Sequence, residues 1–573
     1  MKLINVLFLS LLFVIPAHAV EAPILDSSAR FHPVISRTGM VVSQEQVASQ
    51  VGADILAKGG NAIDAAVATG FALAVTLPRA GNIGGGGFML VYLAEEDRTV
   101  AIDYREMAPS AAFRDLFLDE TGGVDNQKAR FSIFSSGIPG TVAGLIHAQE
   151  KYGQLSLKMV MQPAITLADQ GITVSHDLSQ SLASRSSVMK KNLASAGYFY
   201  KPDGNNYQEG ERLRQKDLAG TLKRIARQGL NGFYGGKTAD LIVAEMQRNG
   251  GLITHQDLKD YRVVEREPVC GTFRENKICA MPPPSSGGVH LIQMLNILEG
   301  WNLQTLGHNS SAYLHRLIES MRRAYADRSK YLGDPDFYSV PVRALTDKQY
   351  AEQLRRQINL MSSSRSSDIL PGLGSPKESM ETTHYSTWDQ WGNVVSNTYT
   401  LNFSYGSGIS VAGAGFLLNN EMDDFSSKPG VPNAYGLVGA EANAIEPKKR
   451  PLSSMTPTIV FNHEEKPVLA TGSPGGSTII TVVLQMLLNV LEFDMNVAEA
   501  TAAPRIHHQW LPDTIFYEKG ISQDTLDLLT QRGHKLAEKS RILGATQTIS
   551  ANKDGVKFGA ADYRRSDAAA ISQ

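Results

Sequence analysis

The sequence predicts an α+β fold in which two stacked β-sheets lie between outer layers of helices. Two observations about element order lead to this expectation. The N-terminal part reads helix, helix, strand, strand, whereas the C-terminal part reads strands followed by helices. A third observation is composition, since 573 residues of which 42% are hydrophobic can bury a large core. An α/β/β/α sandwich accommodates both parts, because helices cover the outer faces of the stacked sheets.

The N-terminal elements begin after residue 43. Residues 44–75 carry two helical patterns separated by Gly59 and Gly60, and Asn61 is placed to cap the second helix. Residues 81–109 follow as two β-rich runs around the turn "EEDR", which predicts a hairpin. The glycines in this hairpin's "GGGG" precede a strand and lack a following Lys-Ser/Thr, so close backbone packing is favoured over a phosphate loop.

A mostly helical region from about residue 140 to 360 leads to a segment of different composition. Residues 362–380 are rich in Ser, Gly and Pro, which predicts a flexible linker. Residues 382–406 and 456–473 are then candidate hairpins, and an apolar helix is expected over 478–491. The Gln and Asn inside that helix suit a buried helix better than a membrane span.

The N-terminus predicts export. Lys2 precedes an apolar run that ends at Pro16, and small residues surround His18, as in a secretory signal peptide cleaved after Ala19. The apolar run is shorter than the roughly 20 residues that a membrane anchor needs. The net charge of −2 and the pI near 6.7 argue against a polyanion-binding protein.

The chain has two cysteines, and neither has the companions of a metal site. Cys270 and Cys279 lie in two short strands on either side of a loop at Arg274 and Glu275, which sets them opposite each other. A local disulfide and a pair of free thiols both remain open. The pair His507–His508 lacks ligand spacing, so core hydrogen bonding or solvent contact is favoured over zinc binding.

The hairpin at 382–406 carries an unusual set of threonines. If it turns about Trp391, Thr382 lies opposite Thr400, because each is nine residues from the turn. Opposed side chains have Cβ atoms about 5 Å apart, close enough for a hydrogen bond between hydroxyls, although a one-residue slip would break the pairing. Thr-rich strands can also reflect β propensity alone. The linker before Thr382 favours a catalytic role for this threonine over β propensity alone. A cut there would free an α-amine that can act as general base for the hydroxyl.

Several motifs resemble the γ-glutamyltranspeptidase family. They are "AGNIGGGGFML" (80–90), "DYREMAP" (103–109), "TTHYS" (382–386), "LLNNEMDDFS" (417–426), "KRPLSSMTPT" (449–458) and "TGSPGGS" (471–477). The resemblance runs from about residue 41 to 561. It implies the four-layer α/β/β/α sandwich of an N-terminal-nucleophile (Ntn) hydrolase, made as a zymogen that cuts itself between Glu381 and Thr382.

The resemblance also divides the chain and assigns catalytic roles. A signal peptide of residues 1–19 would be followed by a large subunit, 20–381, and a small catalytic subunit, 382–573, which stay together as one folded heterodimer. Thr382 is the expected nucleophile, with Thr400 as its hydrogen-bond partner. The backbone N–H groups of Gly475 and Gly476 are expected to form the oxyanion hole.

The remaining implied roles concern a zwitterionic glutamyl group. The carboxylate is expected to bind Arg105, Ser453 and Ser454, since a guanidinium fork suits it. The ammonium is expected to bind Asn402, Glu421 and Asp424. Glu421 stands where the family has either Gln or Glu, so it adds an anion here. Residues 427–450 are expected to form a lid over the pocket with Tyr435 as its gate, rather than a plain surface loop.

The implied activity is hydrolysis or transfer of the γ-glutamyl group of glutathione and related compounds. Water, amino acids or short peptides would be the acceptors, no metal or organic cofactor is implied, and the location would be the periplasm or the medium. Within the same fold, the alternatives are an acylase of β-lactam precursors and a poly-γ-glutamate depolymerase. An inactive relative that only binds γ-glutamyl compounds is the alternative from another class.

Overall fold

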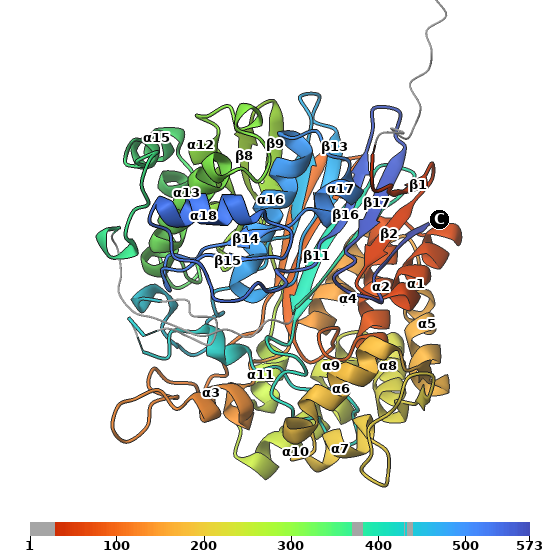
Figure 1. Cartoon of the computed structure of the whole chain (residues 1–573). Helices are drawn as coiled ribbons and strands as arrows, with labels where there is room; N and C mark the ends of the chain where they lie inside the picture. Colours follow the sequence, from red (N-terminus) through yellow and green to blue (C-terminus); the bar gives the residue numbers. More distant parts are fainter. Residues whose placement is uncertain (1–28, 370–381, 429, 432–438) are drawn as a thin grey trace, which may run out of the picture.

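The computed structural model describes residues 29–369, 382–428, 430–431 and 439–573 (Figure 1). Four predicted features therefore lie wholly or partly outside the described residues: the signal peptide, residues 370–380 of the predicted linker, Glu381 on one side of the expected cleavage bond, and Tyr435. No helix within the described ranges is long and apolar enough to cross a membrane.

Two seven-stranded antiparallel sheets form the centre of the molecule. In the first sheet the strand order is β1 (Val34–Ser36), β17 (Lys557–Ala561), β16 (Gln547–Ala551), β13 (Pro467–Thr471), β12 (Thr458–Phe461), β9 (Asn276–Ala280) and β8 (Val269–Phe273). In the second it is β18 (Ala569–Ser572), β2 (Met40–Ser43), β10 (Thr383–Trp388), β11 (Val394–Thr400), β3 (Gly86–Leu93), β4 (Arg98–Tyr104) and β7 (Val264–Arg266).

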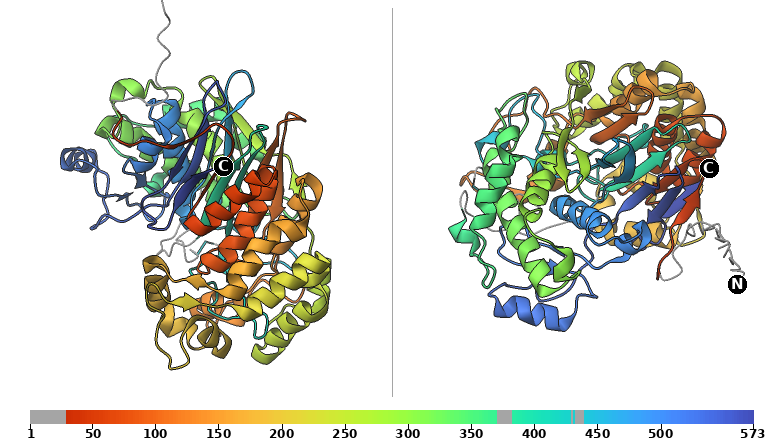
Figure 2. Two further views of the ribbon diagram at one scale, coloured as in Figure 1. Left: turned by 90° about the vertical axis from the view of Figure 1, so that its right-hand side faces the viewer. Right: turned by 90° about the horizontal axis from the view of Figure 1, so that it is seen from above.

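Helices cover both outer faces, so the predicted α/β/β/α layering is confirmed (Figures 1 and 2). One layer contains α1 (Gln46–Ala57), α2 (Ala62–Thr76) and α4 (Thr141–Tyr152), with α5 (Leu157–Gln170) packed on α2 and α8 (Lys216–Gln228) packed on α5. The other contains α12 (Gly287–Leu298), α13 (Ser311–Tyr331), α15 (Lys348–Arg356), α16 (Ile479–Leu491), α17 (Val497–Ala502) and α18 (Gln523–Gln531).

Further α-helices and two small sheets lie outside these layers. The remaining helices are α3 (Asn126–Phe131), α6 (His176–Met189), α7 (Leu193–Phe199), α9 (Asn231–Tyr234), α10 (Gly236–Asn249), α11 (His255–Asp260) and α14 (Val342–Leu345). Two small sheets pair β5 (Ile172–Thr173) with β6 (Arg212–Leu213) and β14 (Ile506–His507) with β15 (Phe516–Tyr517).

Strand periodicity explains the two main cores. Along β3, Met89 and Val91 face the layer of α1 and α2, whereas Phe88 and Leu90 face the first sheet. Both faces of β3 are therefore buried, which accounts for its nearly continuous apolar sequence.

Both sheets contain strands from before and from after residue 381. In the second sheet, β10 and β11 lie between β2 and β3 and pair with both. Five of the twelve strand pairings in the two sheets join a strand from before residue 381 to one from after it, so the two products of a cut between residues 381 and 382 are expected to stay together.

Most element predictions are confirmed. Both N-terminal helices form, and Asn61 caps α2 in a capping box with Asp64. The close backbone packing expected of the glycine run is also present, since a Cβ on Gly85 would lie 1.9 Å from the Thr400 carbonyl oxygen. The apolar helix α16 is buried, and His507 is a core residue that hydrogen-bonds to Thr481.

The linker prediction is wrong for its first part. Residues 363–368 include a short 3₁₀ helix, Ser366–Asp368, and Ser366 is 1% exposed. Composition alone indicated flexibility, but the buried charged side chains of Glu319 and Arg322 on α13 bind Ser364 and Ser366.

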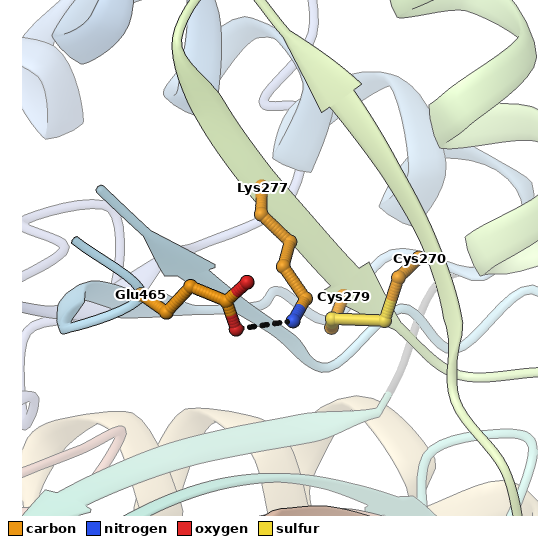
Figure 3. The surroundings of a disulfide bond; sticks show 4 residues. All are labelled: Cys270, Lys277, Cys279 and Glu465. Atoms are coloured by element: carbon orange, nitrogen blue, oxygen red, sulfur yellow. Dashed lines mark hydrogen bonds and ion pairs between the residues drawn. A yellow bond between two sulfur atoms is a disulfide. The ribbon is translucent and has the colours of Figure 1, made fainter. Parts of the chain in front are cut away.

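The two cysteines form a disulfide between the paired strands β8 and β9 (Figure 3). Cys270 and Cys279 are directly opposed, as the two-residue loop predicted. Lys277 lies on the same hairpin and forms an ion pair with Glu465 at 3.0 Å.

Removing the disulfide is expected to reduce stability without changing activity. The bond closes a loop with a sequence separation of 9 residues at one edge of the first sheet, and a loop of that size contributes about 2 to 3 kcal/mol. The variant Cys270→Ser/Cys279→Ser should therefore have a lower thermal midpoint than the oxidised wild type and the same turnover. An unchanged midpoint would contradict the prediction.

Candidate active site

The β10–β11 hairpin brings Thr382 and Thr400 together. The register pairs Thr383 with Tyr399, and continuing it by one residue places Thr382 opposite Thr400, as predicted. The Thr382 hydroxyl donates to the Thr400 hydroxyl oxygen at 3.3 Å, and the two residues are 4% and 2% exposed. Each hydroxyl is held at the end of a central strand.

The glycine-rich segment before β3 hydrogen-bonds to the backbone of Thr400. Asn82 donates to the Thr400 carbonyl oxygen at 2.9 Å and accepts from the Gly85 amide at 2.8 Å. The Thr400 hydroxyl oxygen also accepts from the Asn402 amide at 2.8 Å. Asn402 has φ 75°, a left-handed conformation that Asn tolerates, and this turn directs the chain away from the strand.

A small pocket opens beside the threonine pair. Nine of the predicted site residues line it: Arg105, Thr382, Thr400, Asn402, Glu421, Asp424, Ser453, Ser454 and Gly476. Gly475 is the residue before the lining glycine and is not itself in the lining. Arg328, Leu452, Met455, Ser477 and Ile479 complete the wall.

Arg105 is fully buried at the end of β4 and lies among carboxylates. Its guanidinium forms ion pairs with Glu421 and Asp424, and its Nε donates to the Pro451 carbonyl oxygen at 3.1 Å. Both acidic residues come from the 3₁₀ helix Glu421–Asp424. The structure therefore pairs the residue expected at one end of a zwitterion with two residues expected at the other end.

The electrostatics of this cluster follow from burial. Burial alone would lower the pKa of Arg105, but the carboxylates of Glu421, Asp424 and Glu106 outweigh it and raise that pKa. Burial raises the pKa values of Glu421 and Asp424, and the Arg105 charge opposes this rise. The cluster thus holds ionisable groups that are shielded from water and paired with one another.

Sequence reasoning missed two charged residues of this region. Arg328 of α13 is buried in the pocket wall and donates to Ser286 at 2.9 Å and to Ser454 at 3.1 Å. Burial lowers its pKa to about 10. It sits in a helix with several other basic residues, and no spacing distinguishes it from them.

The second missed residue is Glu106, which is fully buried behind Arg105. Its Oε2 lies 3.5 Å from a guanidinium nitrogen of Arg105, and burial raises its pKa to about 7 against the opposing Arg105 charge. A Cβ on Gly86 would lie 2.6 Å from the same oxygen, so this glycine leaves room for the carboxylate. Its position next to Arg105 in "DYREMAP" could have identified Glu106 as a residue of this site.

The Gly475–Gly476 loop requires glycine. Gly475 has φ 132° and Gly476 has φ 55°, and a Cβ on Gly475 would lie 2.3 Å from the Thr478 hydroxyl. This loop leads into α16 and places Gly476 in the same pocket as Thr382. A backbone amide that lines a pocket can stabilise a developing oxyanion.

Ser453 and Ser454 are held by a backbone pairing with the segment before α12. The Ser453 amide donates to the Pro284 carbonyl oxygen at 2.8 Å, and the Ser453 carbonyl accepts from the Ser286 amide at 2.9 Å. Both serine side chains belong to the pocket wall beside Arg328. Within the described residues, no group of three or more His, Cys, Asp or Glu is placed to hold a metal ion.

Comparison with known proteins gives consistent results. The family model described as gamma-glutamyltranspeptidase matches residues 48–572. The "Glutathione hydrolase proenzyme" of Escherichia coli (strain K12) is 52% identical over 537 residues, covering 94% of this chain and 92% of that protein.

Solved structures show the same fold. The cephalosporin acylase of Bacillus halodurans matches with a TM-score of 0.84 at 27% identity, covering 96% of this chain and 98% of that one. The gamma-glutamyltranspeptidase of Helicobacter pylori matches with a TM-score of 0.56 at 47% identity, covering 57% of this chain and 93% of that one.

Proposed function

Because the chain belongs to the γ-glutamyltranspeptidase family, we propose that it hydrolyses or transfers the γ-glutamyl group of glutathione and related compounds through an ester on Thr382. The observation that carries this proposal is that the paired hydroxyls of Thr382 and Thr400 open into the pocket that contains Arg105, Glu421 and Asp424. A nucleophile and a recognition site for a zwitterion thus share one small cavity.

Activation starts with self-cleavage of the precursor. The Thr382 oxygen attacks the carbonyl carbon of Glu381, the C–N bond breaks, and the nitrogen takes up the hydroxyl proton. Water then hydrolyses the resulting ester, which leaves a carboxylate on Glu381 and an α-amine on Thr382. The products are a large subunit, 20–381, and a small subunit, 382–573, which remain a heterodimer because both contribute strands to each of the two sheets.

The same threonine then acts on the donor. Its hydroxyl attacks the γ-glutamyl amide carbon while its new α-amine accepts the proton, and the protonated amine passes that proton to the leaving amine. The amides of Gly475 and Gly476 stabilise the oxyanion. Water or the amine of an amino acid or peptide then attacks the ester carbon and releases Thr382.

The charged cluster explains recognition of the glutamyl end. A ligand carboxylate that binds Arg105, with Ser453 and Ser454, replaces the internal carboxylate partners of that guanidinium. The freed Glu421 and Asp424, together with Asn402, then bind the ligand ammonium. Each buried charge keeps an opposite partner throughout, so the exchange avoids the large cost of an unpaired buried charge.

Export and lid closure belong to the same proposal. The signal-like residues 1–19 support release of a protein that begins at Val20 and works in the periplasm. Tyr435 is proposed as the gate of a lid formed by residues 427–450, and its support is the sequence resemblance alone.

Intact mass under denaturing conditions, with N-terminal sequencing of the exported protein, tests this proposal. We expect two chains, one beginning at Val20 and one at Thr382, and turnover of γ-glutamyl-p-nitroanilide. A folded, exported, single uncut chain without turnover would contradict the proposal and favour an inactive γ-glutamyl-binding protein.

An acylase of β-lactam precursors is the second candidate, because the Bacillus halodurans cephalosporin acylase has the same fold. Two guanidinium groups and three carboxylates in and behind the pocket suit a free glutamyl zwitterion better than an acyl side chain that lacks an ammonium group. A panel of glutathione, poly-γ-glutamate and a cephalosporin acyl donor decides among the candidates by kcat/KM.

Glu106 is expected to make donor binding depend on pH. With its pKa raised to about 7, the carboxyl is neutral below that pH and becomes an anion above it. The anion would compete with the donor carboxylate for Arg105, so KM should rise above about pH 7 in the wild type. Glu106→Gln should flatten this rise, because the amide never ionises.

The control for this prediction is Glu96→Gln, which changes an exposed residue in the β3–β4 turn. It should keep the wild-type profile of KM against pH. A Glu106→Gln profile that coincides with the wild type would remove Glu106 from donor recognition.

A further inference from the structure

One buried arginine beside the threonine pair differs from the others in its charge environment. Arg328 lies in the last turn of α13, is 5% exposed and lines the pocket that contains Thr382. No carboxylate of the described residues forms an ion pair with it. The other arginines buried in this part of the chain each form at least one ion pair with Asp or Glu: Arg79, Arg105, Arg322, Arg323, Arg450 and Arg505.

A buried guanidinium without an adjacent anion is costly. Removing a charged group from water costs several kcal/mol unless an opposite charge and hydrogen bonds compensate for it. The acceptors of Arg328 are two neutral hydroxyl oxygens, those of Ser286 and Ser454. Burial lowers the pKa of Arg328 to about 10, whereas at Arg105 the carboxylates outweigh burial and raise the pKa. Such a cation, placed in the wall of a pocket, indicates that an anionic ligand completes its surroundings.

Arg328 also holds the two serines that are expected at the donor carboxylate. Its Nη2 donates to the Ser454 hydroxyl oxygen at 3.1 Å, and its Nε donates to Ser286 at 2.9 Å. The Ser286 hydroxyl in turn donates to the Ser453 carbonyl oxygen at 2.8 Å. The Ser454 hydroxyl hydrogen is donated to no residue within the described ranges, so it is available to a ligand. A ligand oxygen that accepts it lies within two hydrogen-bond lengths of Arg328.

The two guanidinium groups of the pocket differ in how many of their donors are in use. Arg105 is bound by the Pro451 carbonyl oxygen and by the carboxylates of Glu421 and Asp424. Nη1 of Arg328 makes no hydrogen bond to any residue that the structure describes. A guanidinium carries five N–H donors in a fixed plane. Arg328 can therefore receive a carboxylate without giving up an ion pair of its own.

We propose that Arg328 binds the α-carboxylate of the γ-glutamyl donor together with Arg105 and Ser454, and that it thereby selects donors that keep this carboxylate. This inference rests on the γ-glutamyl activity proposed above. Because a second guanidinium shares the ligand carboxylate, Arg105 needs to break fewer of its ion pairs when the donor binds. Glu421 and Asp424 remain close to Arg105 and are at hand for the donor ammonium.

The test compares Arg328→Gln with Lys330→Gln on fully processed protein. Both changes remove one positive charge from the last turn of α13, but Lys330 is exposed. Values of kcat and KM are measured with γ-glutamyl-p-nitroanilide and with 4-aminobutanoyl-p-nitroanilide, which differs from the first donor only in lacking the α-carboxylate. Inhibition of γ-glutamyl turnover by L-glutamate and by 4-aminobutanoate gives the same comparison without turnover of the second donor.

Arg328→Gln should lower kcat/KM for the γ-glutamyl donor about 30-fold, mainly through KM, because it removes one side of a buried charge contact. It should have little effect on the decarboxylated donor, in which that contact is absent. Inhibition by L-glutamate should weaken relative to inhibition by 4-aminobutanoate. Lys330→Gln should match the wild type with both donors.

Arg328→Lys is a second variant, which keeps the charge in case its loss prevents folding. A lysine cannot donate to Ser286 and Ser454 through one planar fork. It should therefore lose part of the kcat/KM for the γ-glutamyl donor, less than Arg328→Gln loses, and again spare the decarboxylated donor.

The outcomes separate this inference from the proposed function. If a variant of Arg328 loses kcat/KM equally with both donors, or with neither, Arg328 does not bind the carboxylate, and the γ-glutamyl activity of the wild type stands. A wild type that is processed but turns over neither donor would overturn the proposed function and the role of Arg328 together.

Discussion

Thr382→Ala is expected to remain one chain and to show no γ-glutamyl turnover. The substitution removes the oxygen that attacks both the Glu381 carbonyl and the donor amide, so activation and catalysis fail together. Loss of a nucleophile lowers kcat by on the order of 10⁴-fold or more. Thr382→Ser should retain cleavage at a reduced rate, because it keeps the hydroxyl. Intact mass measures cleavage of the chain, and a γ-glutamyl anilide assay measures turnover.

The matched control is Thr383→Val. Thr383 is the adjacent, fully buried threonine, and its hydroxyl has no hydrogen-bond partner in the part of the chain that the structure describes. Replacing an unsatisfied buried hydroxyl with a methyl group of the same shape is close to neutral. Processing of Thr382→Ala at the normal site would show that Thr382 is not the nucleophile.

Arg105→Lys is expected to raise the donor KM by about 100-fold, with a smaller effect on kcat. A lysine retains the charge but cannot pair with two carboxylates through a planar fork, and truncating one member of a buried charge pair costs 2 to 5 kcal/mol. Glu421 and Asp424 would then share one point charge. Michaelis kinetics with a γ-glutamyl anilide separate the effects on KM and kcat.

Arg98→Lys is the control for this change. Arg98 begins the strand that Arg105 follows, but its side chain is 47% exposed and pairs with Glu96 on the surface. An exposed pair contributes little, so this variant should keep the wild-type KM. An unchanged KM in Arg105→Lys would remove Arg105 from carboxylate recognition.

The register of the central hairpin could be predicted from local sequence alone. Equal arms about Trp391 predicted that Thr382 and Thr400 would face each other, and the observed register agrees. This succeeded because strand periodicity and a short turn fix register without help from distant residues. The disulfide hairpin at Cys270 and Cys279 followed from the same local rule.

Composition misled where tertiary contacts dominate. Residues 363–368 looked like a flexible linker, but Ser364 and Ser366 are bound by side chains more than 40 residues away in the sequence. Serine is mostly found exposed, so composition pointed away from the burial that is observed at Ser366. Its environment depends on which charged groups the fold brings near it. Spacing in the sequence does not show which distant side chains these are.

The sequence by itself determined the layered fold, the strand pairing of the threonines and membership of the family, because these depend on local periodicity and on motifs in order. Only the tertiary structure decided that Arg105 pairs with Glu421 and Asp424, that Arg328 from a distant helix completes the pocket, and that Glu106 lies behind it. Burial and electrostatic pairing act through space, so they appear only when separated segments are packed together.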